Sequence, residues 1–182
     1  MCKQEIVLDL CRQLRLGAYI SDVYSTTEAE THEEFLIKLL TGAVEARELE
    51  RCNRYLRQAG FEVHKTFENY SFEDIRLPEL LSTEMLKACD FLKHKQNLIL
   101  YGKPGTGKTH LATALGVEAC KQGKSVLFYT AASLGNKLIE MQDQILLTKF
   151  IEKLKKVDLL ILDELGYVSL SQKSTQLLFQ VF

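Results

Sequence analysis

Eight consecutive residues near the middle of the chain have the types and spacing of a phosphate-binding loop. They are Gly102, Lys103, Pro104, Gly105, Thr106, Gly107, Lys108 and Thr109, and they fit the pattern G-x-x-x-x-G-K-[ST]. Glycine at 105 and 107 lets the backbone turn its N–H groups toward phosphate oxygens, and a following helix adds the positive end of its dipole. Lys108 would hold the β- and γ-phosphates, and the Thr109 hydroxyl would bind Mg²⁺. The pattern predicts a nucleotide site.

Two adjacent carboxylates downstream of this loop are the expected partners for the metal and the attacking water. Asp163 and Glu164 end the apolar run "LLIL". Asp163 would hold Mg²⁺ through its water shell, and Glu164 would act as general base toward water. A buried strand often ends in polar residues without any chemistry, but the phosphate loop upstream favours the functional interpretation. A glutamate beside the aspartate also favours hydrolysis over binding alone.

The elements that must position these groups alternate between strands and helices. Short apolar runs predict buried strands at 97–102, 125–130 and 157–164, and helical patterns lie at 108–121, 132–156 and 172–182. This alternation predicts a parallel sheet with crossover helices, hence an α/β fold.

The N-terminal part is predicted to be helical. An amphipathic pattern covers 5–16, and Thr31 with Glu34 forms a capping-box signature before a long helix over 33–59. Gly60 is a plausible stop for that helix. Residues 61–82 have little periodicity and several aromatics, which indicates a linker or arm before a short helix at 83–94.

Composition excludes several classes of protein. The net charge is −1, so any nucleic-acid contact must come from a local patch rather than from the whole chain. The five cysteines are far apart, without a zinc-ligand spacing, which is typical of free thiols in a reducing compartment. The first ten residues are too charged for a signal peptide, and no apolar run is long enough to span a membrane. We expect a cytoplasmic protein.

Several stretches together resemble the IstB-like helper ATPases of insertion-sequence transposition, within the DnaC/DnaA-like AAA+ group. The stretches are "GKTHLATALG", "LKKVDLLILDELGY", "LLFQVF", "HEEFLIKLL" and "RYLRQAGFEVHKTFENYSF". The resemblance implies a P-loop NTPase core preceded by a helical domain. It implies that 1–65 serve DNA binding and assembly, 66–97 form a linker arm and helix, and 98–182 form a partial AAA+ core.

By the same resemblance, residues 102–109 bind ATP, Thr109 and Asp163 serve Mg²⁺, and Lys108 and Glu164 are catalytic. It implies duplex DNA, a partner transposase and further copies of the chain as partners. A DnaC-like loader of the replicative helicase, or a nucleotide-binding remnant without activity, remains as an alternative.

The resemblance also implies sheet order 5-1-4-3-2, and the residues of strands four and five, the trans-acting arginine and the C-terminal lid are not found here. We therefore expect an incomplete core, a fragment or an interrupted gene product. Strands one and three would either close up or leave apolar faces partly open. ATP binding would be weakened, and hydrolysis would be impaired because an arginine finger is worth about 10³–10⁵ in rate.

Four further groups carry two interpretations each. Arg47, Arg51, Arg54 and Arg57 fall on one helix side, opposite Leu49, Cys52, Leu56 and Ala59, and either contact phosphates or form a solvated face. The aromatics Phe67, Tyr70 and Phe72 either border the adenine or pack under the linker. His110 is expected to have a packing or surface role. The lysines Lys149, Lys153, Lys155 and Lys156 contact DNA or a neighbouring subunit, or form a solvated helix face.

Overall fold

The computed structural model describes residues 2–141, 144–166 and 171–181. Its chain divides into two compact units, Met1–Asn53 and Arg54–Phe182. Tyr167, the last residue of the "DELGY" stretch, lies outside the described residues. The functional division at residues 65 and 97 stays a prediction.

The first unit is helical, as its sequence patterns predict. It contains α1 (Lys3–Gln13), α2 (Tyr19–Val23) and most of α3 (His32–Ala59). The Glu34 N–H donates to Thr31 Oγ1 at 3.1 Å, and the Glu34 carboxylate accepts from the Glu30 N–H at 3.0 Å. The first bond satisfies an amide group that the first turn of a helix leaves without a partner, and the second ties the residue before Thr31 to that turn. The helix ends before Gly60, which has a φ of +79°.

The second unit contains the sheet. Its elements are η1 (Phe67–Asn69), α4 (Thr83–Lys87), α5 (Asp90–Lys93), α6 (Lys108–Lys121), β1 (Val126–Thr130), α7 (Ala131–Glu140), α8 (Gln144–Lys156), β2 (Leu159–Asp163) and α9 (Gln172–Phe179). β1 and β2 pair in parallel, with Val126 opposite Leu159 and Thr130 opposite Asp163. α7 and α8 form the crossover that a parallel pair requires.

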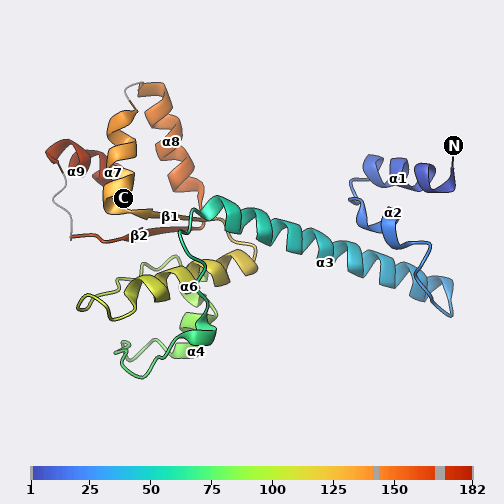
Figure 1. Cartoon of the computed structure of the whole chain (residues 1–182), viewed down its shortest axis with the longest axis horizontal. Coiled ribbons are helices and arrows are strands. Elements are labelled where there is room, and N and C mark those ends of the chain that lie inside the picture. The colour runs from blue at the N-terminus through green and yellow to red at the C-terminus, as the bar shows by residue number, and fades with distance from the viewer. Residues whose placement is uncertain (1, 142–143, 167–170, 182) are drawn as a thin grey trace. The chain divides into compact units, whose positions relative to one another are not determined.

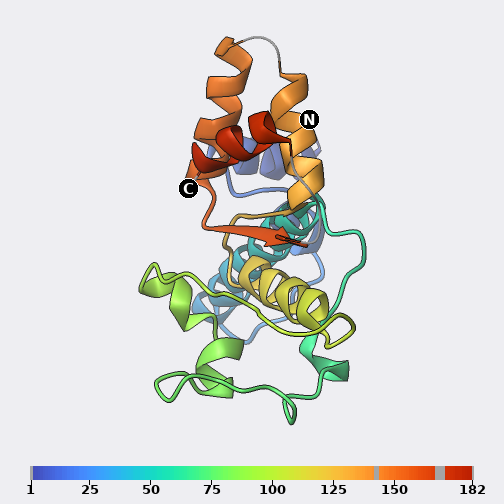
Figure 2. The same ribbon diagram turned by 90° about the vertical axis from the view of Figure 1, so that its left-hand side faces the viewer.

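Helices cover both faces of this pair of strands (Figures 1 and 2). Val126 and Phe128 point into the apolar cluster beneath α6, and Leu127 points into a second cluster with residues of α7, α8 and α9. α6 approaches β2 closely at Gly116, where an added Cβ would lie 2.8 Å from Ile161 Cδ1. The sheet is therefore the middle layer, as expected for an α/β fold.

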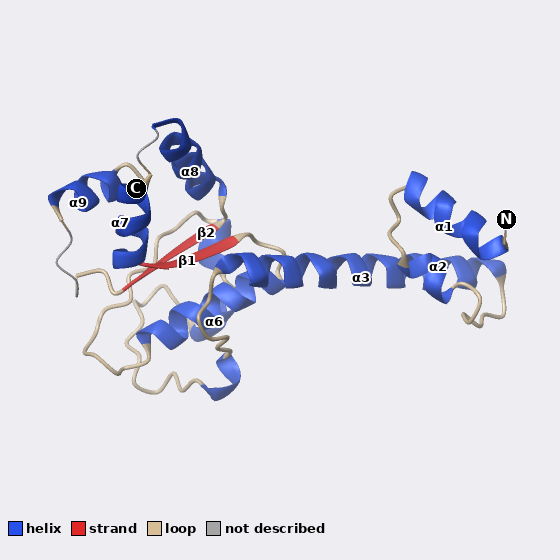
Figure 3. Cartoon of the chain, turned by 45° about the horizontal axis from the view of Figure 1, so that its top comes forward, coloured by secondary structure: helices blue, strands red, loops and turns tan. Residues whose placement is uncertain are grey.

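The predicted strand at 97–102 is wrong. These residues have no strand geometry, and within the described residues the strands are β1 and β2 (Figure 3). Leu98 and Leu100 pack against the cluster beneath α6, whereas Ile99 is 90% exposed and Tyr101 is 98% exposed. The alternation is that of a strand, but a strand also needs a neighbour for its backbone hydrogen bonds. Of the two expected outcomes, the strands do not close up, and the apolar faces stay partly open at Ile99 and Tyr101.

Two smaller expectations also need correction. The helix expected at 83–94 is split into α4 and α5 by Cys89, whose φ of +53° interrupts a right-handed helix. Leu49 does not face a core, because its side chain is 63% exposed, whereas Ala59 at the end of α3 is buried.

In the part of the chain that the structure describes, no helix combines the length and apolar character needed to cross a membrane.

Candidate functional site

The phosphate-loop residues lead directly into a long helix. α6 begins at Lys108, and Gly107 is its N-cap, with the Leu111 N–H donating to the Gly107 carbonyl at 2.9 Å. Gly105 and Gly107 both have a φ of +79°, a conformation that costs other residues about 1–2 kcal/mol. The sequence folds this way locally because glycine supplies the turn and the apolar pattern of 108–121 supplies the helix. The loop therefore presents amide groups at a helix N-terminus, where anions bind.

Internal hydrogen bonds hold the loop closed on itself. The Lys108 ammonium donates to the carbonyls of Gly102 at 2.9 Å and Lys103 at 2.7 Å. The Thr106 hydroxyl also donates to the Lys103 carbonyl, at 2.9 Å. Lys108 is half-buried and Thr109 is exposed. A phosphate entering the loop would exchange those carbonyl contacts of Lys108 for stronger, charge-assisted hydrogen bonds.

The aromatic arm packs against the end of this loop. Tyr70 lies so close to Gly107 that an added Cβ would be 3.1 Å from its ring, and its ring centre is 5.0 Å from that of His110. His110 Nε2 lies 2.9 Å from the Thr66 carbonyl oxygen. Burial raises the pKa of the Tyr70 hydroxyl. His110 thus has the expected packing role, and Tyr70 touches the loop itself, which the sequence did not indicate.

The two carboxylates lie at the carboxyl end of β2, with Asp163 as its last residue and Glu164 directly after it. Asp163 is paired with Thr130 at the carboxyl end of the sheet, and its Oδ1 accepts from the Glu164 N–H at 2.9 Å. Glu164 is exposed and has a φ of +57°, a left-handed conformation that glutamate rarely adopts. Thr130 is a neighbour that sequence reasoning missed, and its hydroxyl caps α7 by accepting from the Ser133 N–H at 3.1 Å.

The oxygen atoms near the loop and at the end of β2 fit Mg²⁺, which needs few ligands from the protein. They do not fit a metal ion that is coordinated only by protein side chains. Among the described residues, no group of three or more His, Cys, Asp or Glu side chains could hold a metal ion. Mg²⁺ is commonly bound by one or two protein oxygens together with waters and substrate phosphates. The exposed Thr109 hydroxyl and the Asp163 carboxylate are oxygens of that kind.

Of the other candidate residues, the arginines of α3 and the lysines of α8 lie on helix surfaces, whereas Phe67 and Phe72 are half-buried against the cluster beneath α6. Arg47, Arg51, Arg54 and Arg57 are all exposed on α3. Arg47 donates to the Arg15 carbonyl, and the Arg54 guanidinium lies 5.6 Å from the ring centre of Tyr55. Phe67 and Phe72 pack together, with ring centres 5.9 Å apart. The lysines Lys149, Lys153, Lys155 and Lys156 are exposed on α8.

Comparison with known proteins adds to this geometry. The family model described as IstB-like ATP binding protein matches residues 12–182. The insertion sequence IS5376 ATP-binding protein of Geobacillus stearothermophilus is 31% identical over 87% of this chain and 63% of its own length. The insertion sequence IS21 ATP-binding protein of Pseudomonas aeruginosa is 28% identical over 100% of this chain and 69% of its own length.

A second kind of relative matches a shorter stretch. The replicative helicase loader DnaC of Buchnera aphidicola is 36% identical over 56% of this chain and 42% of its own length. Across these three relatives, the chain spans between about two fifths and about two thirds of the relative's own length.

Proposed function

Because the chain belongs to the family of IstB-like ATP-binding proteins, we propose that it binds ATP with Mg²⁺ and assists a transposase in DNA transposition. The observation that carries the proposal is the loop of residues 102–109. Its two left-handed glycines and its lysine lie at the start of α6, the geometry needed to hold a triphosphate.

Each residue of the site then has a separate role. The amides of the loop and of the first turn of α6 bind the phosphate oxygens. Lys108 leaves the Gly102 and Lys103 carbonyls to hold the β- and γ-phosphates. Mg²⁺, when bound, neutralises the charge that develops on the phosphates. Thr109 and Asp163 supply oxygens to the metal or its waters. Glu164 is the group that would deprotonate the attacking water, and we propose that this step is impaired in residues 1–182.

The relatives favour transposition over helicase loading. Four relatives named for insertion sequences match 81–100% of the chain, among them the proteins from Sinorhizobium fredii and Pseudomonas aeruginosa, and a fifth, from Pseudomonas fluorescens, matches 53%. The two helicase loaders match 56% and 64%. The proposal accordingly names a transposase and duplex DNA as partners, together with further copies of the chain, and places the protein in the cytoplasm.

Substitution of the loop lysine tests the nucleotide site. Lys108→Ala should reduce ATP affinity to below detection, because the charge that would hold the β- and γ-phosphates is lost. Lys103→Ala is the matched control, since it removes an exposed lysine from the same loop without removing that contact. Affinity is measured with a fluorescent ATP analogue, and circular dichroism checks that both variants are folded. Unchanged affinity in a folded Lys108→Ala variant would contradict the nucleotide assignment.

A further inference from the structure

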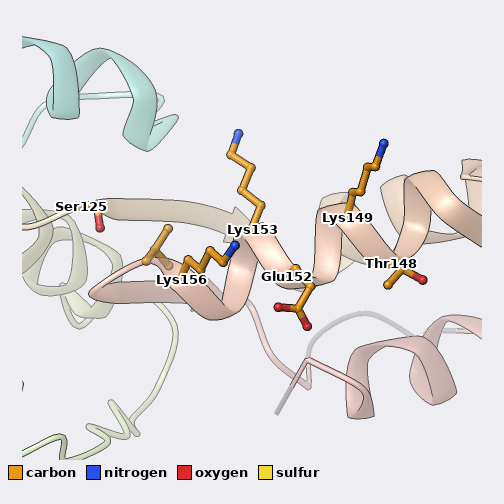
Figure 4. A pocket seen from close by; sticks show the side chains of 7 residues that line it. Ser125, Thr148, Lys149, Glu152, Lys153 and Lys156 are labelled. Carbon is orange, nitrogen blue, oxygen red and sulfur yellow. The ribbon is translucent and has the colours of Figure 1, made fainter.

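Three lysines of α8 form a narrow basic face, here called the α8 lysine face: Lys149, Lys153 and Lys156. With about 100° per residue, their directions fall within about 60° around the helix axis. They line a groove together with Ser125, Thr148, Glu152 and Val157. Lys149 and Lys153 extend to the same side of α8, and Glu152 extends to the other (Figure 4).

None of the three lysines forms an ion pair within the described residues, although Glu152 stands at helical spacing from two of them. Three other helical lysines are ion-paired: Lys38 with Glu34 at 2.7 Å, Lys93 with Asp90 at 2.7 Å and Lys121 with Glu118 at 3.6 Å. Among the described residues, five further helical lysines form no ion pair either: Lys3, Lys87, Lys137, Lys155 and Lys173. The α8 lysine face therefore keeps its three ammonium groups in solvent, in a chain whose net charge is only −1.

Stabilisation of the helix does not account for the whole face. Lysines in the last turn interact favourably with the helix dipole, and α8 has Lys153, Lys155 and Lys156 in that turn. Lys149 lies near the middle of the helix, beyond the reach of that effect. Phe150, Ile151 and Leu154 bury the opposite side of α8, so the lysines are not needed for packing.

The spacing of the lysines matches a nucleic-acid backbone. At about 1.5 Å per residue, Lys149 and Lys156 are about 10.5 Å apart along the helix axis. A strand of duplex DNA carries one phosphate per about 3.4 Å of helix axis, hence about three phosphates over that length. Solvent-exposed ammonium groups spread over that length can contact phosphates of one strand.

The α8 lysine face adjoins the end of the sheet opposite to Asp163, which is proposed to serve the nucleotide site. Ser125, which lines the groove, directly precedes β1, whereas Thr130 and Asp163 end the two paired strands. Five residues of strand separate these ends by about 13 Å. An occupant of the groove therefore does not compete with ATP for the same groups.

We infer that the α8 lysine face binds the phosphate backbone of duplex DNA without reading its sequence. The inference rests on the proposed association with DNA and names the surface of the chain that makes the contact. Lysine contacts to phosphates carry no sequence information, and they make the affinity strongly dependent on salt.

The test combines substitution with a salt titration of the full chain. A triple variant with Lys149→Ala, Lys153→Ala and Lys156→Ala is compared with a charge-matched control carrying Lys93→Ala, Lys121→Ala and Lys155→Ala. Anisotropy of a short fluorescein-labelled duplex of mixed sequence reports the affinity. The face variant should bind at least about tenfold more weakly at low salt, and the slope of log affinity against log salt should fall by about 2.7. The control should bind like the unaltered chain.

Two results would overturn the inference. One is a face variant that binds the duplex with the affinity and salt slope of the control, including the case in which no form of the chain binds DNA. The other is a face variant that loses binding to poly-glutamate while it keeps its affinity for DNA, which would assign the groove to an acidic protein. ATP affinity is measured on the same samples, so a failure of the nucleotide assignment is detected separately.

Discussion

At the scale of single residues, the turn at residues 102–109 and the helix after it could be predicted because the residues that form them are contiguous. Their phosphate-binding role stays a proposal. Gly105, Gly107 and Lys108 carry their conformational and charge properties with them, and the structure gives both glycines a positive φ. The position of Tyr70 against Gly107 could not be predicted in this way. It depends on the path of an arm without regular structure, which no local pattern determines.

The backbone of Glu164 leads to a prediction about stability. Its φ of +57° should cost about 1 kcal/mol relative to glycine, which adopts this region freely. Glu164→Gly should therefore unfold at higher urea concentration than Glu164→Ala, with a free energy of unfolding about 1 kcal/mol larger. Alanine is the matched control because it also lacks the carboxylate but keeps the strain. Equal stability of the two variants would contradict a strained backbone at this position.

At the scale of elements, helices and strands were predicted where local patterns suffice. α3, α6, β1 and β2 fall within a few residues of their predicted bounds. The prediction of a strand at 97–102 was wrong because a strand needs a neighbouring strand. The apolar alternation of the segment gives no information about such a neighbour. The break between α4 and α5 was not predicted because the left-handed conformation of Cys89 leaves no signal in the sequence.

A polar contact fixes the starts of the two strands relative to each other. Asp158 Oδ2 accepts from the Ser125 N–H at 2.8 Å and from its hydroxyl at 2.7 Å, and the Asp158 N–H donates to Ser125 Oγ at 3.0 Å. Burial by itself would raise the pKa of Asp158. The hydrogen bonds from Ser125 and the charge of Lys124 outweigh it, so that the pKa is lowered.

This lowered pKa predicts a pH-dependent stability. A carboxyl group with a lower pKa in the folded state stabilises the fold above its unfolded pKa of about 3.9, and the contribution is lost as pH falls through the folded pKa. Asp158→Asn should therefore lower the free energy of unfolding at pH 7 by no more than about 1 kcal/mol, because solvent screens this partly exposed group.

Urea unfolding at a series of pH values measures this effect. The difference between Asp158→Asn and the unaltered chain should stay constant from pH 7 to about pH 5 and shrink as the pH falls through about 3.9 toward the folded pKa. Asp74→Asn, at another exposed aspartate, is the control. A difference that is independent of pH would mean that the charge of Asp158 does not contribute.

At the scale of the whole molecule, the sheet separates the two proposed sites. Asp163 and Thr130 stand at its carboxyl end, and the α8 lysine face adjoins the start of β1 at the other. The family could be predicted from stretches spread over both units, and its model matches residues 12–182. The loss of strand geometry at 97–102 is a property of the assembled sheet and could not be derived from any one stretch.

That open sheet leads to a prediction about turnover by residues 1–182. The segment 97–102 leads into the phosphate loop but does not pair with β2, so no shared sheet holds Glu164 beside the bound phosphates. Correct placement of catalytic groups can account for about 7–11 kcal/mol of a reaction barrier. The chain should therefore bind ATP yet release phosphate no faster than its Glu164→Gln variant.

Phosphate release and ATP binding, measured on the same preparations, decide between binding alone and catalysis. Glu164→Gln is the matched variant because it keeps the size of the side chain and removes only its ability to act as a base. Equal, slow release from both chains at saturating ATP would support binding without efficient turnover. Fast release that Glu164→Gln abolishes would mean that β2 and the phosphate loop meet without a paired strand at 97–102. The packing of α6 against β2 at Gly116 would then be sufficient to align the site.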